Sequence, residues 1–127
     1  MPFSLSATDL VSIVDDDPFV RAAVRSFVRS LGGEAREFAS GPAFLASDAV
    51  SRTGCLICDI QMPGMDGIDV LSRIEADGLH IPTLFVTAFA TARERERVTA
   101  STALCLLEKP IDAQEFEAWL ARALGRG

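Results

Sequence analysis

The chain has 127 residues, the usual length of one domain, and its 49% hydrophobic and 24% charged residues are typical of a globular protein rather than a disordered one. The 18 acidic side chains outnumber the 12 basic ones, for a formal net charge of -6. An acidic surface disfavours direct binding to nucleic acid or to an anionic membrane. No apolar run is long enough to span a membrane, and residues 1–10 lack the pattern of a signal peptide, so we expect a cytoplasmic protein with 1–127 as a single domain.

The three cysteines have two interpretations. Cys55 and Cys58 have the C-x-x-C spacing of a redox pair or of half a zinc site, and Cys105 makes the count odd. However, the first two fall in an apolar run typical of a buried strand, in which residues three apart point to opposite faces. We therefore interpret Cys55 and Cys58 as small buried hydrophobic residues, and we expect the three cysteines not to form a disulfide framework.

Strand and helix patterns alternate along the whole chain. Short apolar runs are typical of strands covered on both faces, and apolar residues at helical spacing predict amphipathic helices between them. In chain order the predicted elements are a strand within 7–14, a helix over 20–31, a weak edge strand over 34–38, a helix from Ser40 to about Arg52, a strand over 55–58, a helix that begins after Asp66, a strand over 83–86, a polar helix over 91–101, a strand over 103–107 and a helix over 116–124.

This alternation, without an internal repeat or a linker, predicts a parallel sheet with right-handed crossovers. The fold class is therefore α/β, with a three-layer sandwich in which helices cover both faces of the sheet. In such sheets ligands bind beyond the carboxyl ends of the strands. We therefore look for functional residues at those ends.

Acidic residues follow two of the predicted strands. Asp15, Asp16 and Asp17 follow the first strand, and Asp59 follows the third. Asp17 precedes a proline, which is typical of a helix N-cap. The other three carboxylates would raise one another's proton affinity unless a cation lies between them, and an all-oxygen site suits magnesium. His80 is interpreted as a solvated loop residue.

Two further strands end in a hydroxyl and an ammonium group. Thr87 follows the fourth strand, and Lys109, the one lysine beside eleven arginines, follows the fifth. Each has a simpler explanation, since Lys109 could be an ion-pair partner and Thr87 a residue that bonds its local backbone. Together with the carboxylates, however, they are suited to phosphoryl transfer to Asp59, which would become an aspartyl phosphate.

Four segments resemble receiver domains of two-component response regulators, especially those of FixJ type. They are residues 13–17 (IVDDD), 58–67 (CDIQMPGMDG), 86–88 (VTA) and 108–110 (EKP), and the resemblance covers about 9–124. It implies a (βα)5 flavodoxin-like fold with a parallel five-stranded sheet of order 2-1-3-4-5. It also implies that Asp59 takes a phosphoryl group from a histidine kinase, a phosphotransfer protein or a small phosphodonor, and that this shifts the conformation and partner binding.

The resemblance also assigns ligand roles. It implies Mg²⁺ (or Mn²⁺) bound by Asp16, Asp59 and the backbone carbonyl of Gln61, with Asp15 holding the ion through water. Thr87 and Lys109 would contact the phosphoryl group and relay its arrival. The peptide bond between Lys109 and Pro110 is expected to be cis.

The sequence departs from the family pattern at two positions. Leu106 stands where the family usually has Phe or Tyr, and Thr102 stands where it usually has glycine. Activation would then depend more on the loop after Thr87 and on the helix that follows it. In that helix the charges alternate over 93–97, which is typical of a solvated face, although relatives use this region as an output surface.

Two other classes of protein are alternatives to a signalling domain. A phosphatase of haloacid dehalogenase type also uses an aspartyl nucleophile and magnesium, but it needs an aspartate at the position of Gln61 as general acid and base. A dinucleotide-binding fold lacks support because no G-x-G-x-x-G motif follows the first strand. The sequence leaves open the output and whether phosphorylation produces a homodimer.

Overall fold

The computed structural model describes residues 3–125 and contains a five-stranded parallel sheet of order β2-β1-β3-β4-β5. This confirms the predicted strand order. The strands are β1 (Leu10–Val14), β2 (Glu34–Phe38), β3 (Cys55–Asp59), β4 (Thr83–Thr87) and β5 (Cys105–Glu108). The helices are α1 (Pro18–Ser30), α2 (Gly41–Leu45), the 3-10 turn η1 (Val50–Arg52), α3 (Gly67–Ala76), α4 (Ala92–Thr99) and α5 (Ala113–Ala123).

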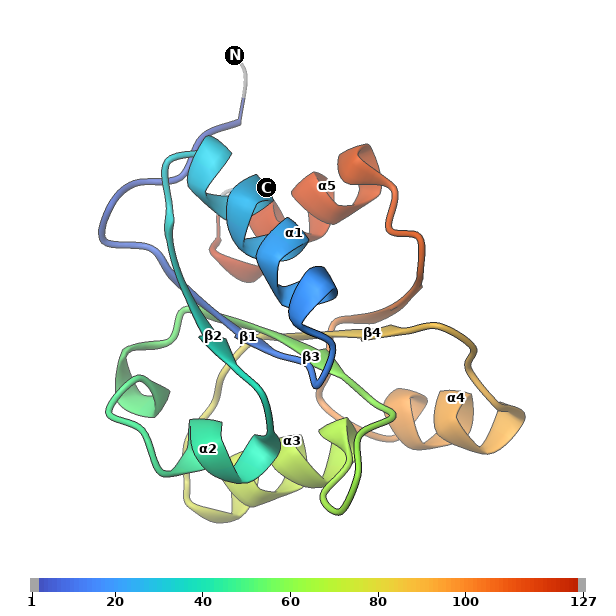
Figure 1. The fold of residues 1–127 in the computed structure, drawn as a ribbon. Coiled ribbons are helices and arrows are strands. Elements are labelled where there is room, and N and C mark those ends of the chain that lie inside the picture. The colour runs from blue at the N-terminus through green and yellow to red at the C-terminus, as the bar shows by residue number, and fades with distance from the viewer. Residues whose placement is uncertain (1–2, 126–127) are drawn as a thin grey trace.

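The helices cover the two faces of the sheet unequally, with α1 and α5 on one face and α2, α3 and α4 on the other (Figure 1). Alternate residues of the strands supply two separate apolar cores. Cys55 belongs to the core beneath α1 and α5, and Cys58 belongs to the core beneath α3. Burial raises the pKa of both thiols. The buried interpretation of this C-x-x-C is therefore confirmed.

The helix predicted from Ser40 to about Arg52 is shorter than expected. Ser40 does cap it, but the helix ends at Leu45, and a 3-10 turn follows after a break. The Ser47 hydroxyl donates to the Phe44 carbonyl and accepts from the Ala49 N–H, so it replaces helical backbone bonds with local ones. The prediction was wrong at this point because serine competes for the backbone.

Other local predictions are confirmed. Asp17 is the N-cap of α1 and accepts a hydrogen bond from the Phe19 N–H at 2.9 Å. His80 is exposed, and the peptide bond between Lys109 and Pro110 is cis. Within residues 3–125 none of the helices combines the length and the apolar composition needed to cross a bilayer.

Candidate functional site

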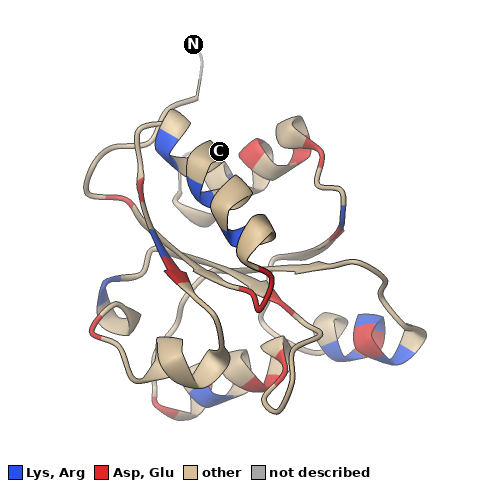
Figure 2. Cartoon of the chain, viewed as in Figure 1, with Lys and Arg blue, Asp and Glu red and all other residues tan. Residues whose placement is uncertain are grey.

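Acidic side chains from two neighbouring strands meet at the carboxyl edge of the sheet. The segment after β1 and the end of β3 carry them, and red positions mark this edge in Figure 2. Asp15 and Asp59 are buried and Asp16 is exposed, and one carboxylate oxygen from each lies within 4.8 Å of the others. The structure therefore brings together the three carboxylates that the sequence placed at one edge.

Lys109 lies beside this cluster. Its Nζ atom is 3.1 Å from Asp15 Oδ2 and 3.7 Å from Asp59 Oδ2. Strand β5 is separated from β1 by two strands, so this contact exists only because the sheet aligns the strand ends. One ammonium faces three carboxylates, and the cluster keeps an excess of negative charge.

That excess affects Asp59. Burial and the charge of Asp15 raise the pKa of Asp59 to about 6, although Lys109 and the backbone N–H of Gln61 act in the opposite direction. The Gln61 N–H lies 3.3 Å from Asp59 Oδ1. At neutral pH the Asp59 carboxylate is mostly ionised, so an oxygen is free to act as a nucleophile or as a metal ligand.

Thr87 completes the edge from β4. Among the residues that the structure describes, its Oγ1 is the buried side-chain polar atom without a hydrogen-bond partner. An unsatisfied buried polar group costs roughly 1–3 kcal/mol, so it is retained where a ligand or a second conformation satisfies it. This does not fit the simpler explanation of Thr87 as a residue that only bonds its local backbone.

These donor groups fit a hard divalent cation. Three clustered carboxylates supply only oxygen, which magnesium and manganese prefer, and the exposed Asp16 leaves a side open to water. Both buried cysteine thiols belong to the hydrophobic cores instead. The ligand roles of the individual residues, including the Gln61 carbonyl, stay predictions.

Gly67 supports the site in a way that the sequence analysis did not identify. A Cβ atom at this position would lie 2.1 Å from the Asp59 carbonyl oxygen, so only glycine lets α3 begin this close to β3. Gly67 also donates its N–H to the Ile60 carbonyl at 3.0 Å. In the sequence, the glycine directly after the predicted N-cap Asp66 was the feature that could have indicated this close approach.

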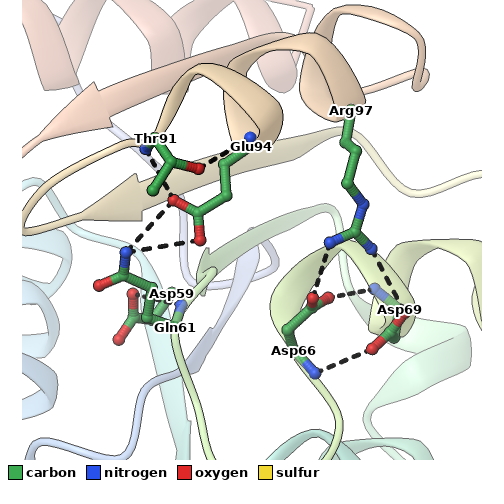
Figure 3. A network of polar contacts seen from close by, with 7 residues as sticks. All are labelled: Asp59, Gln61, Asp66, Asp69, Thr91, Glu94 and Arg97. Carbon is green, nitrogen blue, oxygen red and sulfur yellow. Dashed lines mark hydrogen bonds and ion pairs between the residues drawn. The ribbon is translucent and has the colours of Figure 1, made fainter.

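The polar helix α4 also contacts the site segment. Glu94 and Arg97 reach Gln61, Asp66 and Asp69 in the segment after β3, as Figure 3 shows. The charges over 93–97 are therefore not simply a solvated face, and Arg95 pairs with Glu108 of β5 as well. Sequence alone could not find these partners, because they are distant in the chain.

The two departures from the family pattern have local consequences. Leu106 is half-buried and lines a groove of about 370 Å³ between α4 and β5. Thr102 is exposed, needs no positive φ, and donates its hydroxyl to Glu75 of α3 at 2.8 Å. The segment before β5 therefore forms without a glycine.

A parallel five-stranded α/β sandwich with an acidic cluster, a lysine and a threonine at its carboxyl edge defines the class of receiver-type phosphoacceptor domains. The family model for the response regulator receiver domain matches residues 11–121. The chain therefore belongs to the response regulator receiver domain family, whose members act in two-component signalling.

Individual relatives agree with this assignment. Nodulation protein W of Bradyrhizobium diazoefficiens is 31% identical over 87% of this chain and 49% of its own length. Transcriptional regulatory protein FixJ of Azorhizobium caulinodans is 30% identical over 99% of this chain and 58% of its own length. The chain thus spans about half the length of the curated relatives that it matches.

Solved structures agree as well. The response regulator receiver protein from Burkholderia phymatum is 37% identical, with a TM-score of 0.80 over 94% of this chain and 97% of that one. Chemotaxis protein CheY4 of Vibrio cholerae is 26% identical, with a TM-score of 0.83 over 93% of this chain and 100% of that one. The flavodoxin-like (βα)5 fold is thereby confirmed.

Proposed function

We propose that Asp59 is the phosphoacceptor of this domain and that its phosphorylation is the signal. The observation that carries the proposal is the buried Asp59 carboxylate with the Lys109 ammonium 3.7 Å away and two further carboxylates beside it. An Asp59 oxygen attacks the phosphorus of the donor, and the bond between phosphorus and the donor's nitrogen or oxygen breaks. The donor keeps that electron pair, and an aspartyl phosphate forms.

The neighbouring groups supply the electrostatics. Lys109 would neutralise charge on the phosphoryl oxygens, and the unpartnered hydroxyl of Thr87 would donate to one of them. Mg²⁺ or Mn²⁺ bound by Asp15, Asp16, Asp59 and the Gln61 carbonyl would add positive charge at the same oxygens. The ammonium, the hydroxyl and the metal ion would all act where negative charge gathers during transfer.

Position 61 governs how long the phosphoryl group would persist. Gln61 has no side-chain acid or base to activate water, unlike the aspartate that a haloacid dehalogenase phosphatase needs there. Its amide also donates to the Phe89 carbonyl and to Glu94. We infer slow hydrolysis of the phosphorylated state, which suits a signalling domain rather than a phosphatase.

The partners follow from the same chemistry. We infer that a cytoplasmic histidine kinase or phosphotransfer protein donates the phosphoryl group, and that the output passes to another protein or segment or to a homodimer. The net charge of -6 favours such a partner over direct contact with nucleic acid. Nodulation protein W and FixJ are each matched over only part of their length, so the output of this chain does not follow from theirs.

The test is labelling with acetyl phosphate in the presence of magnesium, followed by intact mass. Wild-type protein should gain the mass of one phosphoryl group, and Asp59→Asn should gain none while keeping its circular dichroism spectrum. Asp77→Asn, at the exposed end of α3, is the matched control and should label like the wild type. Labelling of Asp59→Asn would show that another residue is the acceptor.

A further inference from the structure

Helix α4 is joined to the chain around Asp59 by the side chain of Gln61 (Figure 3). Gln61 Nε2 donates to the Phe89 carbonyl at 2.8 Å and to Glu94 Oε1 at 3.2 Å. Its backbone N–H lies 3.3 Å from Asp59 Oδ1. One residue therefore contacts the acceptor carboxylate through its main chain and α4 through its side chain.

A second connection lies one helical turn further along α4. Arg97 donates to Asp66 Oδ2 at 2.9 Å and pairs with Asp69 Oδ1 at 3.4 Å. Asp66 and Asp69 also form the capping box of α3, so Arg97 joins the last turn of α4 to the first turn of α3. Together we call the Gln61–Glu94 and Arg97–Asp66/Asp69 contacts the α4 clamp.

Polar contacts provide most of the attachment of α4, because Arg95 also pairs with Glu108 of β5 in addition to the contacts of the clamp. Val98 is the buried residue of this helix, and it lies near the C-terminal end. Glu94 and Arg97 are half-buried on the side that faces α3, whereas Arg93 and Glu96 are exposed. A helix end held by polar side chains can be released without opening a hydrophobic core.

The side chain of Gln61 also restrains the segment between Thr87 and α4. Thr87 Oγ1 is buried without a partner and is therefore available to donate to a phosphoryl group on Asp59. Phe89 lies two residues after Thr87, and its backbone carbonyl accepts a hydrogen bond from the Gln61 side chain. If Thr87 moves to contact a phosphoryl group, the bond between Gln61 and the Phe89 carbonyl opposes that movement.

We propose that the α4 clamp is an autoinhibitory restraint, which holds α4 in its unphosphorylated position and opposes the arrangement in which Thr87 contacts a phosphoryl group on Asp59. This rests on the proposed function of Asp59. A restraint that favours one of two conformations lowers the population of the other conformation. It therefore lowers the apparent affinity of the protein for a ligand that binds that other conformation. Weakening the clamp should therefore tighten binding of a phosphoryl mimic.

The experiment is calorimetric titration with beryllofluoride in the presence of magnesium. Glu94→Ala and Arg97→Ala should each lower the half-saturating concentration roughly two- to fivefold, the range expected from partly exposed polar pairs. The matched controls are Glu96→Ala and Arg93→Ala, which change the same residue types on the exposed side of α4. Both controls should bind like the wild type.

A conservative variant separates the clamp from the cap of α4. The Glu94 carboxylate also accepts the Thr91 N–H at 3.0 Å, so Glu94→Ala removes a capping contact as well. Glu94→Gln keeps an oxygen for both donors and should restore the wild-type affinity. Arg97→Ala leaves the cap of α4 intact and should still tighten binding.

Amide hydrogen exchange without magnesium or beryllofluoride supplies an independent readout. Glu94→Ala and Arg97→Ala should speed exchange in α4 more than in α3. Faster exchange with unchanged or weaker beryllofluoride binding would overturn the restraint, because a purely structural role predicts that result. Failure of the wild type to bind beryllofluoride, or equal binding by Asp59→Asn, would instead overturn the proposed function and the restraint with it.

Discussion

Helices α3 and α4 lie on the same face of the sheet but are attached to it by different forces. Helix α3 buries Gly67, Ile68, Val70, Leu71 and Ile74. Helix α4 buries Val98 and otherwise uses charged side chains that pair with β5 and with the segment after β3. Apolar burial fixes α3 in one place, because a displacement of this helix would expose its core residues to water.

The polar contacts of α4 have a different energy scale. Partly exposed ion pairs contribute about 0.2–1 kcal/mol each, and water replaces them when they break. Helix α3 begins against the Asp59 carbonyl, and α4 contacts Gln61, two residues after Asp59, through Glu94. We therefore expect a change of charge at this edge to displace α4 at lower cost than α3.

The largest expected effect comes from the core beneath α3. Leu71→Ala should lower the free energy of unfolding by about 3 kcal/mol, because it removes a side chain that is 1% exposed. Val98→Ala in α4 removes fewer atoms, from a side chain that is 7% exposed, and should lower the free energy of unfolding by about 1 kcal/mol. Urea unfolding followed by circular dichroism measures both. Equal losses would contradict the contrast between the helices.

The next effect isolates the charge at the edge from helix packing. The pKa of Asp59 is raised to about 6, so the folded state binds a proton more tightly than the unfolded state does. Ionised Asp59 therefore destabilises the fold above pH 6, and this penalty disappears as the pH falls toward the ordinary value near 4. In metal-free buffer at pH 8, Asp59→Asn should be more stable than the wild type by about 2 kcal/mol.

The measurement for Asp59→Asn is urea unfolding across this pH range. The gain should shrink steadily as the pH is lowered from about 6 to about 4, since both proteins are then neutral at position 59. Asp77→Asn, on the exposed end of α3, controls for loss of an aspartate and should show no such trend. A gain that is independent of pH would point to packing rather than charge.

The smallest expected effect is that of salt concentration on amide exchange in α4. Raising sodium chloride from roughly 0.05 M to roughly 0.5 M shortens the screening length severalfold and weakens exposed ion pairs. Amides of α4 should then exchange about twice as fast, whereas amides of α3 should be unchanged. Hydrogen exchange measured by mass spectrometry resolves the two helices. An equal response in α3 would show that polar contacts hold both.

Most of the fold was predictable because it follows from local pattern. Apolar runs identified four strands, helical spacing identified α1 and α5, and the motif residues identified the order of the sheet, while β2 was predicted only as a weak polar edge strand. The length of α2 was predicted wrongly because the Ser47 hydroxyl bonds to the nearby Phe44 carbonyl. The spacing of apolar residues gives no sign of such a bond. Lys109 could be assigned to the site because the ends of parallel strands meet at one edge.

By itself, the sequence determined the alternation of strands and helices and the residues that stand at the carboxyl edge, since both depend on near neighbours in the chain. Only the tertiary structure decided that Thr87 Oγ1 lacks a partner and that Glu94 and Arg97 face the segment after Asp59. The physical reason is that exposure, pairing and pKa depend on side chains from distant segments. The direction in which each charge of α4 points is set by those segments rather than by the spacing of the charges.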